Sequence, residues 1–304
     1  MKEIKTDLLK RMLAKPFGLN LSTQNLLEAT PSDEGYNQVS GAELTNVDKG
    51  LKQRAGRRLY AEELNKQQNI EDVVQRADNI MQSDPKNNEV QEEADQGWIE
   101  DCLDGAGKTY NDNLKDYWAR LLAGEITKPG TYSKRTVAFM KSLSQKDAER
   151  IRVMCQYVMY SGKENASILQ YDEEMYSFDE IRFLMELRLL DSQSFIVKKY
   201  KFENGEGNMG FYHGDVGFLI KVKKPNYDLP IYAFTELGKE VLSIIDDMPT
   251  NIDSLKHFSE YMLKKNEPME FMCGKLVMVD GKPAINKNDL IFELPEKVLP
   301  VEAI

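Results

Sequence analysis

Histidine, cysteine and long apolar runs are scarce in this 304-residue sequence. The two histidines, His213 and His257, are too few for a site built from several histidines. The three cysteines, Cys102, Cys155 and Cys273, lie far apart and form no C-x-x-C pair, which excludes a disulfide framework and the common zinc-finger spacings. No run approaches the roughly eighteen apolar residues that a membrane-spanning helix needs.

Charge is distributed unevenly along the chain. The net charge is −10, and the segment from Ala61 to Asp104 has thirteen acidic and three basic residues, so that segment accounts for the whole imbalance. An acidic segment repels nucleic acid, although a local basic patch elsewhere can still bind it. An acidic run of this kind is usually a solvent-exposed helix face or a linker, and this structural explanation is favoured here.

Residues 1–50 are expected to form an N-terminal amphipathic helix and a linker. Lys5, Asp7 and Lys10 interrupt any apolar core of a signal peptide, so we expect a cytoplasmic protein. Residues 2–14 place their apolar side chains on one side of a helix with lysines around it. Such a helix docks on its own domain or on a protein partner, and the alternative is contact with a membrane surface.

Residues 51–165 are expected to form a helical core domain. The segment 54–81 has no proline and carries a partial apolar stripe. Its members are Leu59, Leu64, Ile70, Val73, Val74, Ala77 and Met81. Asn111 or Asp112 can cap a further helix, and Ser133 can cap the one after it. Ser144 and Asp147 together resemble a capping box at the start of a further helix.

The second half of the chain changes character. Residues 166–248 contain a helix, two strand-like runs, and a strand leading into a helix capped by Thr235, which is the order of a winged-helix-like module. Residues 249–304 contain a helix and a β-hairpin that turns at 280–281. The expected fold class is therefore mainly α with a smaller α+β part: a helical core, a winged-helix-like module and a C-terminal β-hairpin.

Six lysines lie on the two strand-like runs, which we expect to be adjacent as a ribbon. They are Lys198, Lys199, Lys201, Lys221, Lys223 and Lys224. A basic ribbon can contact phosphates. Against this, Asp179, Glu180 and Glu186 lie on the candidate recognition helix, and lysines on strand edges also prevent aggregation. Nucleic-acid binding is retained as an alternative function.

Two glycine motifs resemble nucleotide-binding loops without meeting their requirements. The run DGAGKT (104–109) has Cys102 where the phosphate-binding loop needs its first glycine, and it follows a helical pattern. The run GEGNMG (205–210) leads into no helix, so no helix N-terminus can hold a pyrophosphate. No cofactor is expected, and neither the histidines nor the carboxylates have the spacing of a catalytic pair.

The stretch YWARLLAGEITKPGTYSKRT (117–136) predicts a helix, a Pro-Gly corner and a second helix. Trp118 belongs to the apolar face of the first helix, and Gly124 is small enough for another helix to approach. Glu125 lies at the helix end, where a negative charge is unfavourable unless a cation meets it. We therefore predict that an ion pair between Glu125 and Arg135 stabilises this corner.

The same stretch carries a family resemblance. Together with RAGRR (54–58), QQNIEDVVQRA (67–77), Trp98-Ile99 and LSQKDAERI (143–151), it resembles the bacterial domain-of-unknown-function 2806 family, from about Arg54 to about Ile245. The L-L-A segment also has a more distant analogy to an abortive-infection alpha family. The resemblance implies a helical core with a winged-helix-like tail, without a settled activity, and the bacterial setting suggests prophage, phage-defence or regulatory roles.

Three hypotheses on function follow. The first is a non-enzymatic cytoplasmic interaction or regulatory protein that acts through protein partners or as a homo-oligomer, in a prophage or phage-defence setting. The second is a winged-helix nucleic-acid-binding protein that uses the lysine ribbon. The third is a metal-dependent nuclease built from clustered carboxylates.

Overall fold

The computed structural model describes residues 46–83, 93–162, 165–170, 176–192, 196–265, 269–279 and 282–295. The chain divides into two compact units, residues 1–145 and residues 146–304. The helix expected at residues 2–14 lies outside the described residues. In the part of the chain that the structure describes, no helix combines the length and the apolar character needed to cross a membrane.

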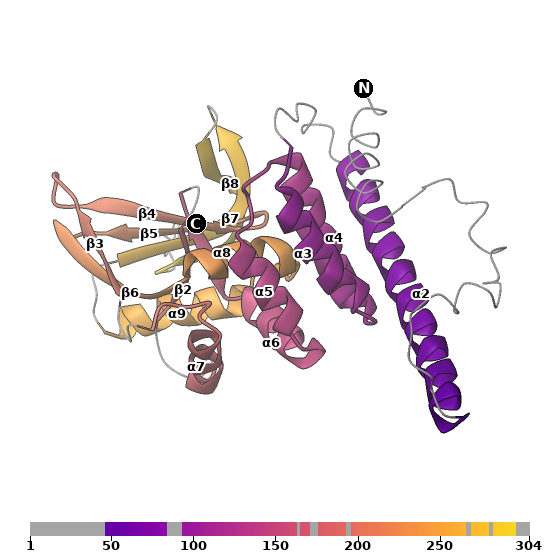
Figure 1. The fold of residues 1–304 in the computed structure, drawn as a ribbon. Coiled ribbons are helices and arrows are strands. Elements are labelled where there is room, and N and C mark those ends of the chain that lie inside the picture. Colours follow the sequence, from indigo (N-terminus) through magenta and orange to yellow (C-terminus); the bar gives the residue numbers. More distant parts are fainter. Residues whose placement is uncertain are drawn as a thin grey trace, which may run out of the picture. The chain divides into compact units, whose positions relative to one another are not determined.

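The first unit is helical. Its helices are α2 (Asn46–Ser83), α3 (Gln96–Gly107), α4 (Asp112–Thr127) and α5 (Lys134–Ser142), with α3 and α4 running alongside α2 (Figure 1). The predicted caps are confirmed: the side chain of Asn111 accepts from the Leu114 amide, and that of Ser133 accepts from the Thr136 amide. The run DGAG forms the last turn of α3.

The core of this unit lies where α2, α3 and α4 meet. Ile70, Val73, Val74, Ala77 and Met81 of α2 are buried, as are Trp118, Leu121 and Leu122 of α4. Gly105 of α3 gives the indole of Trp118 its space, because a Cβ at this position would lie 2.5 Å from the ring atom Cη2. Bulky α4 side chains therefore pack against a small residue of α3.

Ion pairs surround this core. Arg76 of α2 bonds Asp72 on its own helix at 2.8 Å and reaches α4 at Asp112 and Asp116, at 2.9 and 2.7 Å. The hydrogen bond from Arg76 lowers the pKa of Asp72. Asp104 of α3 accepts hydrogen bonds from Lys108, Lys66 and Lys141. These bonds, of which that from Lys108 has the largest effect, lower the pKa of Asp104 to about 2. Part of the acidic segment is thus paired with cations.

The second unit joins helices to one large sheet. Its helices are α6 (Gln145–Cys155), α7 (Phe178–Glu186), α8 (Glu236–Ile245) and α9 (Ile252–Lys264). Its strands are β1 (Val158–Ser161), β2 (Asn165–Leu169), β3 (Ile196–Lys201), β4 (Gly207–His213), β5 (Val216–Val222), β6 (Asn226–Ala233), β7 (Met269–Val279) and β8 (Lys282–Leu294). The strands form an eight-stranded sheet in the order β3-β6-β2-β1-β4-β5-β7-β8, and the paired strands are antiparallel.

The predicted fold class, with its winged-helix-like module, is therefore wrong. The predicted C-terminal hairpin exists as β7 and β8, but β7 also pairs with β5 and joins the large sheet. Strand β1 has four residues, β2 has five, and Tyr160↔Tyr212 is the registered pair that joins β1 to β4. β1 and β2 pair with each other, but their other partners, β4 and β6, come from distant parts of the chain, so a local pattern does not reveal the sheet. The predicted boundaries at 165/166 and 248/249 lie inside this unit.

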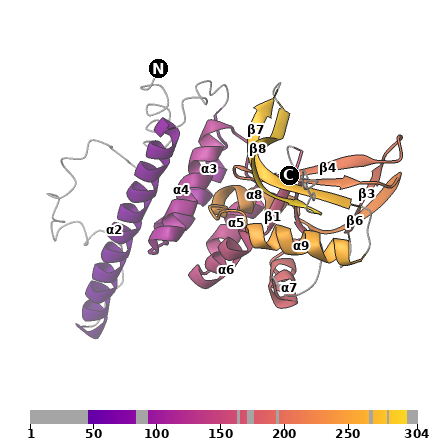
Figure 2. The same cartoon turned by 180° about the vertical axis from the view of Figure 1, so that it is seen from behind.

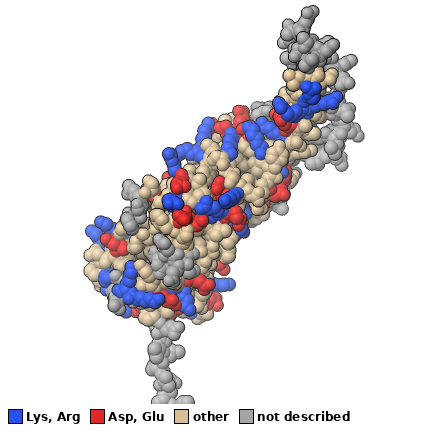
Figure 3. All heavy atoms as spheres, turned by 90° about the horizontal axis from the view of Figure 1, so that it is seen from below, with Lys and Arg blue, Asp and Glu red and all other residues tan. Residues whose placement is uncertain are grey.

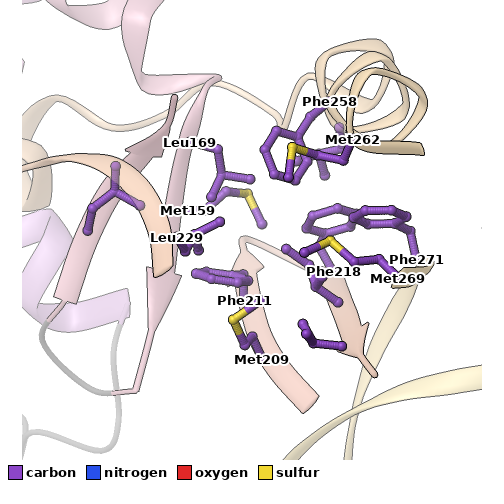
Figure 4. Close-up of a cluster of buried hydrophobic side chains, with 14 of the residues drawn as sticks. Met159, Leu169, Met209, Phe211, Phe218, Leu229, Phe258, Met262, Met269 and Phe271 are labelled. Atoms are coloured by element: carbon purple, nitrogen blue, oxygen red, sulfur yellow. The ribbon is translucent and has the colours of Figure 1, made fainter. Parts of the chain in front are cut away.

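Helix α9 covers one face of the sheet and completes the core of the second unit (Figure 2). Phe258 and Met262 point from α9 toward Phe218 of β5 and Phe271 of β7 (Figure 4). Phe218 is fully buried, and its ring centroid lies 6.2 Å from that of Phe258 and 6.1 Å from that of Phe271. This aromatic cluster packs α9 against the neighbouring strands β5 and β7.

Candidate functional site

The six predicted ribbon lysines do not lie on two adjacent strands, and Lys223 and Lys224 follow β5 in its connection to β6. Lys198, Lys199 and Lys201 belong to β3, at one edge of the sheet, and Lys221 belongs to β5. Strands β6, β2, β1 and β4 lie between β3 and β5. The two-stranded basic ribbon that the sequence suggested is therefore wrong, because the apparent hairpin partners are not hydrogen-bonded neighbours.

Several of these lysines have partners within the protein. Lys221 lies 3.6 Å from Glu206, and Lys223 lies 2.6 Å from Glu270. Lys199 is registered opposite Asp228 in the β3–β6 ladder. Charges of both signs are also intermixed on the face shown in Figure 3. A phosphate group would have to compete with these carboxylates for Lys221 and Lys223.

Lys198, Lys221 and Lys224 are half-buried, whereas Lys199, Lys201 and Lys223 are exposed. The Nζ atom of Lys198 donates to Oγ of Ser161 at 2.6 Å, and burial lowers its pKa. The ammonium also lies 5.5 Å from the ring centroid of Tyr200. Its geometry is that of a partly buried structural lysine.

The corner between α4 and α5 is held by Glu125. This side chain is 3% exposed, and its two oxygens accept hydrogen bonds from the backbone amides of Gly130 at 2.7 Å and Tyr132 at 2.9 Å. Trp118 is buried as predicted. Arg135 is exposed, so the predicted Glu125–Arg135 ion pair is replaced by amide donors from the corner itself.

The small residue beside Glu125 also has a different role from the predicted one. A Cβ at Gly124 would lie 2.7 Å from the ring of Tyr132, so this glycine admits a corner side chain and not another helix. The family-like stretch is thus a closed structural corner in which the carboxylate, the amides and the tyrosine ring fix the chain path.

Replacing Glu125 by alanine is expected to lower the free energy of unfolding of the first unit by about 1–3 kcal/mol, because the buried amide of Tyr132 and the partly buried amide of Gly130 lose their acceptor. Arg135→Ala is the matched control and should stay within about 0.5 kcal/mol, as is usual for exposed positions. Urea denaturation followed by tryptophan fluorescence measures both. Equal losses in the two variants would restore the ion-pair interpretation.

A buried polar cluster in the second unit was not predicted. His213, at the end of β4, is 5% exposed, and its Nε2 lies 3.0 Å from Oδ2 of Asp246, just after α8. The hydroxyl of Tyr160 donates to the same carboxylate oxygen at 3.0 Å. Because a carboxylate only accepts hydrogen bonds, Nε2 carries the hydrogen. His213 and Asp246 are 33 residues apart in the sequence, so no local motif could reveal the pair.

The environment of this cluster favours a structural role. Burial, followed by the nearby charge of Asp246, raises the pKa of Tyr160. Burial also raises the pKa of the Cys155 thiol, so this thiol stays protonated and is a poor nucleophile. The ring nitrogen Nδ1 of His213 has no hydrogen-bond partner among the described residues. The cluster connects β1, β4 and the end of α8.

The described residues of the second unit also enclose a small cavity. This cavity, lined by Tyr157, Tyr176, Ser254 and Phe258, has room for about one water molecule, which is too small for a metabolite. No group of three or more His, Cys, Asp or Glu side chains in the described ranges could hold a metal ion. The clustered carboxylates of the nuclease hypothesis are therefore not found in this part of the chain.

A surface with several exposed large apolar side chains lies on α2. We call residues 50–65 of this helix the α2 extension. The last turn of α3 lies beside the residues that follow the extension, since Lys66 pairs with Asp104 at 3.2 Å and Asn69 donates to the Gly107 carbonyl at 3.0 Å. Figures 1 and 2 show this end of α2 running on past the end of α4. No residue of the extension is buried.

The α2 extension exposes large apolar side chains. Leu51 is 58% exposed, Leu59 55%, Leu64 46% and Tyr60 43%. Leu59 and Leu64 belong to the apolar stripe that the sequence showed, but only its later members, from Ile70 onward, are buried. The apolar stripe was therefore visible in the sequence. The structure shows which part of the stripe α3 and α4 cover and which part is exposed.

Comparison with known proteins yields a family and no named relative. Residues 53–254 match the family model described as "Protein of unknown function (DUF2806)", and the chain belongs to this family. No curated protein and no solved structure matches the chain.

Proposed function

We propose that this member of the DUF2806 family is a non-enzymatic cytoplasmic interaction or regulatory protein, which acts by binding a protein through the α2 extension. The observation that supports the proposal is the exposure of Leu51, Leu59, Tyr60 and Leu64 on one unpacked helical segment. A concentration of large exposed apolar side chains on one helical segment favours an interaction surface. The prophage or phage-defence setting in this proposal comes from the bacterial distribution of the family and from the distant abortive-infection analogy.

The source of helix stability also supports this proposal. In proteins, most of the stability of a helix comes from packing of one face against the rest of the structure. The described residues bury no side chain of the extension. Packing against a protein surface would bury the leucines and stabilise the segment in the helical form, so binding and helix formation would favour each other.

The test is a comparison of the native chain with Leu59→Ser/Leu64→Ser. We expect the native protein to form a homo-oligomer, or to retain a protein from its own cell extract, and the double variant to lose at least about ten-fold in affinity, since each buried leucine contributes about 1.5–3 kcal/mol. Light scattering and sedimentation velocity measure self-association, and affinity capture measures retention of another protein.

Ile80→Ser is the matched control, because Ile80 lies on the same helix outside the extension and is 37% exposed. It should bind like the native chain, and circular dichroism should show the same helix content for all variants. A native chain that is monomeric at every concentration and retains no protein would contradict the proposal.

A further inference from the structure

We propose that the partner of the α2 extension is a second copy of this chain, bound through the same segment with the two helices antiparallel. The inference rests on the proposed function and specifies its partner. It follows from the direction in which the side chains of α2 point and from the order of charges along the extension.

The face of α2 that is buried further along the helix continues into the extension. Eleven residues make about three helical turns, so positions eleven apart point in nearly the same direction. Leu59 precedes the buried Ile70 by eleven positions, and Glu63 precedes the buried Val74 by eleven. Lys52 precedes Glu63 by the same spacing. Lys52, Leu59 and Glu63 therefore lie on one face, which loses its cover where α3 ends.

The charges of the extension are segregated along its length. Residues 50–58 carry Lys52, Arg54, Arg57 and Arg58 without an acidic residue, whereas residues 59–65 carry Glu62 and Glu63 without a basic one. A parallel pair in register would place the four cations of each copy together, which is repulsive. An antiparallel pair places the basic half of each copy beside the acidic half of the other.

A specific register satisfies both the charges and the packing. With the two-fold axis between Arg57 and Arg58, Lys52 of each copy is level with Glu63 of the other, and these residues lie on the same face. Leu59 is then level with Gly56 of the second copy, where the missing side chain allows close approach. Because a two-fold interface is isologous, each of these contacts forms twice.

Nucleic acid fits this surface less well. The basic half alone would attract phosphates, but Glu62 and Glu63 follow within the next two turns and would repel them. The exposed leucines would find no apolar partner on a phosphate backbone. A second copy offers a carboxylate to Lys52, a cation to Glu63 and close apolar contact to Leu59. Binding of nucleic acid is therefore the competing outcome of the test.

The test uses charge reversal in the full-length chain. Lys52→Glu and Glu63→Lys each turn two attractive contacts into two repulsive ones, and we expect each to raise the dimer Kd about ten-fold, given the modest strength of exposed ion pairs. The double variant Lys52→Glu/Glu63→Lys restores both contacts with the signs exchanged and should return the Kd to within about three-fold of native. Sedimentation velocity over a concentration series gives the three constants.

Two further variants separate the register from general charge effects. Gly56→Leu favours the helix by propensity but fills the place of close approach, so we expect a weaker dimer with unchanged helix content. Arg57→Glu makes the same charge change on the side of the helix away from Lys52 and Leu59 and should weaken the dimer less than Lys52→Glu does.

The outcomes distinguish this inference from the proposed function. A dimer Kd that is unchanged in Lys52→Glu and Glu63→Lys overturns the antiparallel register. A double variant whose Kd stays as high as those of the single variants also overturns it. A monomer that retains a different protein through Leu59 and Leu64 overturns the second copy but leaves the proposed function standing. Retention of a duplex DNA oligonucleotide, lost in Lys52→Glu, would overturn the inference in favour of nucleic acid.

Discussion

Replacing Trp118 by alanine is expected to lower the free energy of unfolding of the first unit by about 3–5 kcal/mol, the usual cost of removing a large aromatic side chain from a core. Trp118 is 1% exposed, and Leu121 and Leu122 on the same helix are also buried. Gly105 faces its ring, and glycine cannot fill the space that alanine would leave. The cavity would therefore persist, and the loss should lie in the upper part of this range.

The remaining tryptophan makes this measurement direct. Trp98 is 3% exposed in the same unit, so its fluorescence reports the unfolding of the first unit in urea after Trp118 has been removed. Tyr110→Ala is the control, because Tyr110 is 70% exposed and its loss should change stability by less than about 0.5 kcal/mol. A midpoint for Trp118→Ala equal to that of the control would contradict the packing described above.

Replacing Phe218 by alanine is expected to lower the free energy of unfolding of the second unit by about 3–5 kcal/mol. Its ring is fully buried and neighbours those of Phe258, Phe271 and Phe292. The cavity would open between the sheet and α9, where contacts from β5, β7 and β8 meet. We therefore expect α9 to lose much of its attachment as well.

The two units allow an internal control for this variant. Both tryptophans lie in the first unit, so tryptophan fluorescence in urea should keep its native midpoint while the circular dichroism transition gains an earlier phase. Phe178→Ala is the matched control, because Phe178 is 47% exposed on α7. Parallel shifts of both signals would show that the two units unfold as one, and an unshifted dichroism curve would contradict the core role of Phe218.

Helix ends were predictable because their causes are local. Asn111, Ser133 and Thr235 each accept a hydrogen bond from an amide three residues later, as their types and positions predicted. The hairpin of β7 and β8 was also found, because its turn and strands are contiguous in the chain. Ser177, which precedes α7, makes no side-chain cap bond, and Glu180 in the first turn of that helix pairs with Arg150 at 3.2 Å.

The candidate sites show the limit of such reasoning at particular residues. The location of Glu125 was informative, but its donors were set by the path of residues 130–132 and not by the nearest cation in the sequence. His213 had no motif partner because Asp246 reaches it only through the tertiary fold. Lys198 and Lys221 looked like neighbours because their strands are close in sequence, although hydrogen bonding placed four strands between them.

The sequence by itself determined the helical first unit, its caps, the buried Trp118 and the apolar, charged pattern of α2, since each depends on residues within a few turns. Only the tertiary structure decided the order of the eight strands, because strand pairing joins residues far apart in the chain. It also decided that the stripe of α2 is covered from Ile70 onward and open at Leu59. Helical periodicity fixes the direction of a side chain, but a neighbour from elsewhere in the chain must arrive to bury it.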